Sequence, residues 1–226
     1  MNNIIRWAIC DDADYICRNF QLDLSMYEDF KFEGKANSPS ECLELVQNIK
    51  PDILLLDIQM QEEKTGIDII PEIKSISPKT KIIMITSFDD SEYIFNAFAN
   101  GADNYVSKTE NIDFIVKTII NVYNNNSVLR PEIAQVLANK SKQVANMQKS
   151  MLYLIEIISK LSTSEYMILK ALCLGKTYKQ IASENFIDAS TVRTHGSRII
   201  KKFNAKSMDE VVNAINELNV LDLFDK

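Results

Sequence analysis

Asp52-Ile53-Leu54-Leu55-Leu56-Asp57 is the stretch of sequence that decides the fold of the first half of the chain. Its apolar core is continuous, which is typical of a central strand in a parallel sheet that is covered on both faces. Lys81–Thr86 has the same pattern, and other strand-like segments lie on either side in the sequence. The expected strands are Ile4–Cys10, Lys31–Ala36, Asp52–Asp57, Lys81–Thr86 and Asn104–Ser107.

Helical patterns alternate with these strands. The clearest one follows Ser38, because Pro39 stands at the first helical position and Glu41 has the spacing of a capping box. Strands that alternate with helices predict an α/β fold, with a doubly wound, flavodoxin-like sheet of five parallel strands over residues 1–122.

Polar side chains stand where the expected strands end, and such sheets bind ligands beyond the carboxyl ends of their strands. These residues are Asp11, Asp12, Asp57, Thr86 and Lys108. Three carboxylates at one edge repel each other, so a cation is needed to keep them ionised, and Mg²⁺ prefers such oxygen ligands. A carboxylate beside Mg²⁺ can attack phosphorus, and the ammonium of Lys108 can pair with an anion.

The charge of the chain is unevenly distributed, although the net charge is −6. Residues 1–122 hold 11 Lys and Arg against 21 Asp and Glu, whereas residues 163–206 hold 8 against 3. Residues 123–160 are also basic, and residues 207–226 are acidic. A basic island behind an acidic half indicates that the two parts have different functions.

Residues 123–160 are expected to form a helical linker that opens at Pro131. From Ile133 to Leu161, in alternating steps of four and three, eight of nine positions are apolar and the exception is Lys140. This heptad pattern meets the usual threshold for a coiled coil, which would make the helix a dimerising stalk. The alternative is one amphipathic helix packed on its own domains, and the extra apolar residues Leu152, Ile155 and Ile157 favour more than one packing surface.

Residues 161–226 have the pattern of a helix-turn-helix. Thr163 or Ser164 is expected to cap a helix that begins near Glu165 and ends at Gly175. A short helix Tyr178–Glu184 and a turn at 185–189 come next. Ser190 is then expected to cap a helix that runs to about Phe203 and carries four basic residues: Arg193, Arg198, Lys201 and Lys202.

The order and placement of Asp11, Asp12, Asp57, Thr86 and Lys108 resemble those of the receiver domain of bacterial two-component response regulators. The resemblance implies that Asp57 is the phosphoacceptor for a sensor histidine kinase. It implies Mg²⁺ ligation by Asp11, Asp12, Asp57 and the backbone carbonyl of Gln59. Lys108 would pair with the phosphoryl oxygens, Thr86 would move to bond them, and Tyr105 would be the aromatic switch that turns inward.

Two departures from the receiver pattern concern loops. The family usually has Pro four residues and Gly eight residues after the acceptor, whereas this chain has Gln61 and, one residue late, Gly66. The loop Gln61–Thr65 is therefore expected to be longer than usual. Thr109 replaces the Pro that commonly follows Lys108. Neither change removes an expected phosphoryl ligand, so the chemistry is expected to survive.

Residues 161–215 are similar to the LuxR-type output domain of the NarL/FixJ family of response regulators. The most specific part is Ser190-Thr191-Val192-Arg193-Thr194-His195. The resemblance implies that Arg193, Thr194 and Ser197 face the major groove and that Lys179, Thr191 and Lys201 approach phosphates. It also implies promoter DNA as partner, a framework role for His195, and a homodimer to which a terminal helix near Asp209–Leu218 would provide a contact. Tyr178 departs from the family, since a small polar residue is usual there.

Two other functions are weighed against a DNA-binding regulator. A phosphatase with an Asp nucleophile needs a second Asp two residues later, where this chain has Gln59, so we expect no enzyme. A DNA-binding regulator whose receiver works without phosphate remains an alternative because of the altered loop Gln61–Thr65. The four cysteines lack CxxC spacing, and the apolar runs are strand-sized, so we expect a cytoplasmic protein with no zinc site, disulfide or membrane span.

Overall fold

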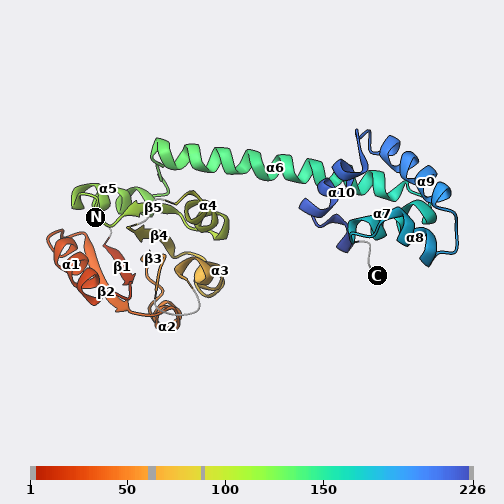
Figure 1. The fold of residues 1–226 in the computed structure, drawn as a ribbon. Coiled ribbons are helices and arrows are strands. Elements are labelled where there is room, and N and C mark those ends of the chain that lie inside the picture. Colours follow the sequence, from red (N-terminus) through yellow and green to blue (C-terminus); the bar gives the residue numbers. More distant parts are fainter. Residues whose placement is uncertain (1–3, 61–64, 88–89, 224–226) are drawn as a thin grey trace. The chain divides into compact units, whose positions relative to one another are not determined.

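The computed structural model describes residues 4–60, 65–87 and 90–223 (Figure 1). Contacts within the chain divide it into two compact units, residues 1–140 and residues 141–226. Each unit is considered by itself.

The first unit is built on a sheet of five parallel strands in the order β2-β1-β3-β4-β5, which confirms the predicted fold class. The strands are β1 Ile5–Cys10, β2 Phe30–Ala36, β3 Ile53–Asp57, β4 Lys81–Thr86 and β5 Asn104–Ser107. In the register, Leu55 at the centre of β3 lies opposite Ile9 of β1 and Ile83 of β4. Every residue of β3 is buried, as its continuous apolar sequence predicted.

Helices cover both faces of the sheet (Figure 1). They are α1 Asp14–Leu24, α2 Pro39–Ile49, α3 Gly66–Ile76, α4 Ser91–Asn100 and α5 Ile112–Tyr123. Leu54 belongs to the apolar cluster under α2, α3 and α4, and its neighbour Leu55 to the cluster under α1 and α5. This alternation follows from the two-residue period of a strand.

The helix α2 begins as predicted, but only half of the predicted capping box forms. The Ser38 hydroxyl accepts a hydrogen bond from the amide of Glu41 at 3.2 Å. The Glu41 carboxylate, however, accepts from the amide of Asn37 at 2.9 Å instead of the amide of Ser38. The Glu41 carboxylate thus bonds the residue before the N-cap and not the N-cap itself.

The long helix α6 Pro131–Ser159 begins within the first unit. Ile133 is only 4% exposed and belongs to the same cluster as Tyr105. Arg130 binds Glu110 at 2.5 Å, and Lys140 forms an ion pair with Glu92 of α4. The start of the predicted linker is therefore packed on the receiver unit. This is the arrangement expected for an amphipathic helix that packs on its own domains, the alternative to a dimerising stalk.

The heptad pattern of α6 is divided between two cores. Leu154 and Ile158 are buried in the core of the second unit, whereas Val144 is 41% and Met147 is 55% exposed. The expected dimerising stalk could use only these middle positions without disturbing either core. Among the described residues, no helix has the length and apolar character that crossing a membrane requires.

The second unit contains the end of α6 and a helical domain, which confirms the predicted all-α output part. Its elements are α7 Thr163–Cys173, α8 Tyr178–Glu184, α9 Ala189–Lys202, α10 Met208–Glu217 and the 3₁₀ helix Val220–Leu223. Leu169 of α7, Val192 and Ile199 of α9 and Ile215 of α10 are buried together with Leu154 in one cluster.

Two predicted helix starts in this unit were wrong. Ser162, not Thr163 or Ser164, caps α7 through a complete capping box with Glu165. The long helix α9 begins at Ala189 after Asp188, so Ser190 lies inside its first turn and is not the cap. The end of α7 was predicted correctly, since Gly175 has φ +81° and its amide donates to the carbonyl of Leu172.

Candidate acidic site and nucleic-acid interface

Three carboxylates meet at the carboxyl edge of the sheet. Asp11 and Asp12 follow β1, and Asp57 is the last residue of β3. One carboxylate oxygen from each lies within 4.8 Å of the others, the only such acidic group found among the described residues. Asp11 is fully buried and Asp57 is 5% exposed, so both charges lie largely out of water. The structure thus brings together the residues that the sequence placed at strand ends.

Lys108, just after β5, bonds two of these carboxylates. Its Nζ lies 2.6 Å from Oδ2 of Asp11 and 3.1 Å from Oδ2 of Asp57. The other oxygens of the two carboxylates accept backbone hydrogen bonds, Asp11 from Ala13 at 2.9 Å and Asp57 from Ile58 at 2.8 Å. Since β1, β3 and β5 hold these three groups, their spacing is fixed by the sheet.

The surroundings of Asp57 shift its protonation. Burial raises the pKa of Asp57 to about 6, while the positive Lys108 opposes the shift and the negative Asp11 adds to it. Burial lowers the pKa of Lys108, but the bonds and charges of Asp11 and Asp57 outweigh that effect and leave its pKa raised. One ammonium therefore has to balance two buried carboxylates, and the site favours additional positive charge.

This donor set fits Mg²⁺. Three oxygen-bearing carboxylates converge from two strand ends, and hard cations of this kind prefer such ligands. Gln59, two residues after Asp57, is exposed, and its backbone carbonyl remains only a predicted ligand. The loop residues 61–64, where the sequence departs from the receiver pattern, lie outside the described residues.

Thr86 and Tyr105 are both buried. Thr86 ends β4, and Tyr105 lies in β5 with its side chain in the cluster that also holds Ile94 of α4 and Ile133 of α6. Tyr105 is thus buried in this structure, and its role as a switch stays a prediction. Its place beside the start of α6 could not be read from the sequence.

Gly66 has a structural role beside Asp57 that its spacing in the sequence did not indicate. It is the first residue of α3, and its amide donates to the carbonyl of Ile58 at 2.9 Å. A Cβ at this position would lie 1.8 Å from the backbone oxygen of Asp57. The glycine is therefore required by the close approach of α3 to Asp57, although it stands one residue later than the family pattern.

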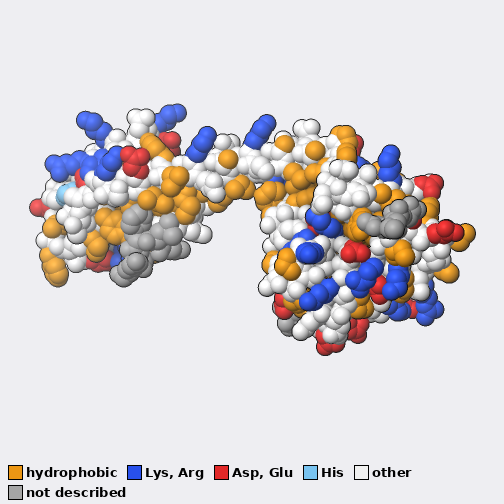
Figure 2. Space-filling view, turned by 180° about the vertical axis from the view of Figure 1, so that it is seen from behind, with side chains coloured by type: hydrophobic (Ala, Val, Ile, Leu, Met, Phe, Trp, Pro, Cys, Tyr) orange, Lys and Arg blue, Asp and Glu red, His pale blue; other side chains and the backbone are white. Residues whose placement is uncertain are grey.

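The residues proposed to contact DNA lie on the surface of the helix-turn-helix. Lys179 belongs to α8. The others lie on α9: Thr191, Arg193, Thr194, Ser197 and Lys201. All six are exposed, and Figure 2 shows Lys and Arg side chains gathered on the output unit at the end where α9 lies. Exposure on α8 and α9 is compatible with the predicted roles, which stay predictions.

Two details modify the predicted interface. The hydroxyls of Thr194 and Ser197 donate to the helix carbonyls of Ser190 and Arg193 at 2.9 and 3.1 Å, so they must turn before they can donate to DNA. Lys202, expected as one of four basic residues of this helix, instead bonds Glu165 at 2.7 Å. That lysine holds α9 against α7 and contributes little free charge.

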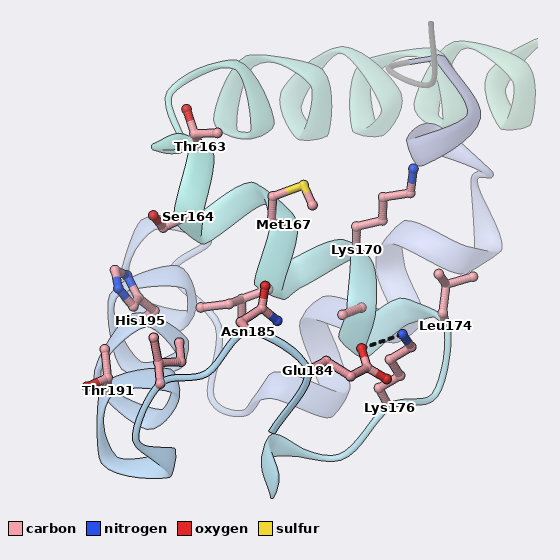
Figure 3. A pocket seen from close by; sticks show the side chains of 13 residues that line it. Thr163, Ser164, Met167, Lys170, Leu174, Lys176, Glu184, Asn185, Thr191 and His195 are labelled. Atoms are coloured by element: carbon pink, nitrogen blue, oxygen red, sulfur yellow. Dashed lines mark hydrogen bonds and ion pairs between the residues drawn. The ribbon is translucent and has the colours of Figure 1, made fainter. Parts of the chain in front are cut away.

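A groove of about 640 Å³ opens beside the start of α9 (Figure 3). Thr191 and His195 of α9 line it together with residues of α7 and the end of α8, and Lys176 binds Glu184 at its rim at 2.6 Å. His195 is half-buried among these helices, which suits the predicted framework role better than a catalytic one.

Comparison with known proteins identifies the class. The model of the response regulator receiver domain matches residues 8–120, and that of the luxR family of bacterial regulatory proteins matches residues 159–215. This chain belongs to the response regulators that join a receiver to a LuxR-type DNA-binding domain. It is a DNA-binding response regulator and not an enzyme.

Two similar regulators match nearly the whole chain, and a solved structure matches about half of it. The response regulator protein VraR of Staphylococcus saprophyticus is 28% identical over 208 residues, 92% of this chain and 94% of VraR. The oxygen regulatory protein NreC of Staphylococcus aureus is 29% identical over 205 residues, 91% and 94% of the two chains. A crystal structure of a LuxR-family DNA-binding response regulator from Staphylococcus aureus matches with a TM-score of 0.50 and 26% identity, over 54% of this chain and all of that one.

Proposed function

We propose that this protein is a transcription regulator whose Asp57 accepts a phosphoryl group from a sensor histidine kinase, and that phosphorylation shifts its dimerisation and DNA binding. The observation that carries the proposal is the bonding of Lys108 to Asp11 and Asp57 at the carboxyl edge of the sheet. The Lys108 ammonium is the group that can pair with a phosphoryl oxygen, and a cation held by the carboxylates would supply the additional positive charge. The protein acts in the cytoplasm, where kinase and promoter DNA are both accessible.

The chemistry is a phosphoryl transfer. An oxygen of Asp57 attacks the phosphorus of a phosphohistidine, an O–P bond forms while the P–N bond breaks, and the imidazole leaves with the electron pair. Asp11, Asp12, Asp57 and the carbonyl of Gln59 are the residues to hold Mg²⁺. When bound, this ion supplies positive charge to the phosphoryl oxygens. Lys108 then moves from the carboxylates to the phosphoryl group.

The signal passes from Thr86 to α4. Only four residues separate Thr86 from Ser91 at the start of α4, and Glu92 in its first turn pairs with Lys140 of α6. A shift of Thr86 toward the phosphoryl group therefore pulls on the segment that holds α6. Tyr105 adjusts with it, because it shares a cluster with Ile94 and Ile133.

The output is binding to promoter DNA by a homodimer. Arg193, Thr194 and Ser197 face the bases of the major groove, while Lys179, Thr191 and Lys201 approach phosphates. An output domain with only a small positive charge should bind DNA weakly as a monomer. Binding of a dimer to two half-sites supplies the rest of the affinity. The exposed Val144 and Met147 of α6 and the helix α10 are the surfaces offered for pairing.

The alternative is a DNA-binding regulator whose receiver acts without phosphate. Incubation with Mg²⁺ and a small phosphodonor, followed by intact mass measurement, distinguishes the two. We expect the parent protein to gain one phosphate and Asp57→Ala to gain none. If neither protein gains a phosphate while DNA binding persists, the alternative is correct.

A further inference from the structure

We propose that Tyr178 and Gly196 form a size-matched pair that sets the separation of α8 and α9 and thereby places Arg193 for DNA. Tyr178 is thus a positioning residue of the DNA interface. The proposal rests on the DNA-binding function of the output unit and goes beyond it, because neither residue is among the expected DNA contacts.

Gly196 lies in the interior of α9, where glycine is unfavourable relative to alanine. It is buried, and a Cβ there would lie 2.9 Å from the hydroxyl oxygen of Tyr178 and 3.1 Å from its Cε1. The first of these distances is below 3.0 Å, a closeness that real Cβ atoms essentially never show. The tyrosine ring therefore occupies the space that a side chain at position 196 would need.

Tyr178 cannot yield easily through its backbone. It is the first residue of α8, directly after Thr177, and the capping box between Thr177 and Gln180 fixes this end of the helix. Its ring is partly buried against the core of the output unit. An added methyl group on α9 must therefore either turn the ring out of its place or push the two helices apart.

The position of the pair connects it to DNA binding. Gly196 lies three residues after Arg193, about one turn along α9. Burial raises the pKa of the Tyr178 phenol, the negative Asp209 raises it further, and the positive Arg193 opposes the shift. Because Arg193 and Gly196 belong to the same helix, a shift of α9 that relieves the contact with Tyr178 also moves Arg193.

The test uses the full chain and the DNA duplex that the parent protein enriches from a random-sequence library. We expect Gly196→Ala to weaken binding about tenfold, the loss of roughly one good contact. When Tyr178→Ser is already present, adding Gly196→Ala should lower the DNA affinity less than about twofold, because the obstructing ring is gone. Tyr15→Ser on the exposed surface of α1 is the matched control and should bind as the parent does.

A positioning role also predicts a dependence on Arg193. In an Arg193→Ala background, Gly196→Ala should have almost no further effect, whereas a general loss of packing would still weaken binding. Should Gly196→Ala fail to fold by circular dichroism, Tyr178→Phe/Gly196→Ala carries the comparison, since it removes the closest atom.

Three results would overturn the proposal. They are parent-like binding by Gly196→Ala, an equal loss with and without Tyr178→Ser, and an undiminished loss in the Arg193→Ala background. A parent protein that enriches no duplex would remove the DNA-binding role itself, and the positioning proposal with it.

Discussion

The ammonium of Lys108 lies 3.1 Å from Oδ2 of Asp57 and balances the charge of this carboxylate. The same nitrogen is closer still to Asp11, at 2.6 Å. Because all three groups are largely buried, removing one partner leaves an uncompensated charge. The ion pair with Lys108 therefore opposes the rise that burial causes in the pKa of Asp57.

We expect Lys108→Gln to raise the pKa of Asp57 further above its ordinary value, because burial then acts without the opposing positive charge. Carboxyl-carbon NMR across pH, with Asp57→Asn to identify the signal, measures the change. Since the folded-state pKa of about 6 already exceeds the ordinary 3.8, protonation of Asp57 favours the folded state, and its ionisation costs stability as pH rises through this range. Lys117→Gln on the exposed side of α5 is the control. A midpoint that stays in place in Lys108→Gln would contradict the role of this ion pair.

Gly66→Ala should destabilise the receiver unit by about 1–3 kcal/mol or more. The added Cβ would lie 1.8 Å from the backbone oxygen of Asp57. Trp7 is the only tryptophan of the chain and is buried in β1, so thermal unfolding followed by its fluorescence reports on this unit. The exposed Ser75→Ala on the same helix should leave the midpoint unchanged. Equal midpoints for the two variants would show that α3 can retreat from Asp57 without cost.

Ile133→Ala should also lower the stability of the receiver unit, by roughly 2–5 kcal/mol, because Ile133 is buried in the cluster around Tyr105. Val128→Ala, a few residues earlier and 75% exposed, should change the free energy of unfolding by less than about 0.5 kcal/mol. The same Trp7 signal measures both. If the two variants unfold alike, the start of α6 is a free linker and not part of the receiver.

The output unit should lose stability in acid through Glu165. Burial raises the pKa of Glu165, but bonds from Lys202 and from Ser162 outweigh it and lower the pKa to about 2. A carboxyl with a depressed pKa stabilises the fold above its ordinary pKa of 4.5, and this contribution disappears as pH falls toward 2.

Thermal unfolding of the output unit, which the fluorescence of Trp7 does not report, can be followed by circular dichroism. Glu165→Gln should begin less stable at neutral pH and lose less between pH 4.5 and 2 than the parent. The exposed Glu217→Gln should follow the parent curve. Identical slopes for all three proteins would mean that the bond between Glu165 and Lys202 contributes nothing.

The sequence allowed the sheet and its acidic edge to be predicted for a physical reason. Continuous apolar runs identify strands that are buried on both faces, and parallel strands must end at one edge, so Asp11, Asp57 and Lys108 had to converge. The output helices followed from their apolar periods and from Gly175. These features depend on local sequence alone.

The remaining features depend on contacts between distant residues. The bond that removes Lys202 from the basic surface joins positions 37 residues apart. The need for Gly66 comes from the path of Asp57, and that for Gly196 from the ring of Tyr178. The packing of Ile133 beside Tyr105 divided a regular heptad between two units. Neither spacing nor periodicity contains this information.

The control of DNA binding by Asp57 is tested most directly by one affinity measurement. The duplex enriched by the parent protein is titrated with parent and Asp57→Ala, each with and without Mg²⁺ and a small phosphodonor, at a fixed salt concentration. We predict that the phosphodonor changes the affinity of the parent at least about tenfold and leaves that of Asp57→Ala unchanged. Equal affinities in all four titrations, with one phosphate confirmed on the parent by mass, would contradict the account.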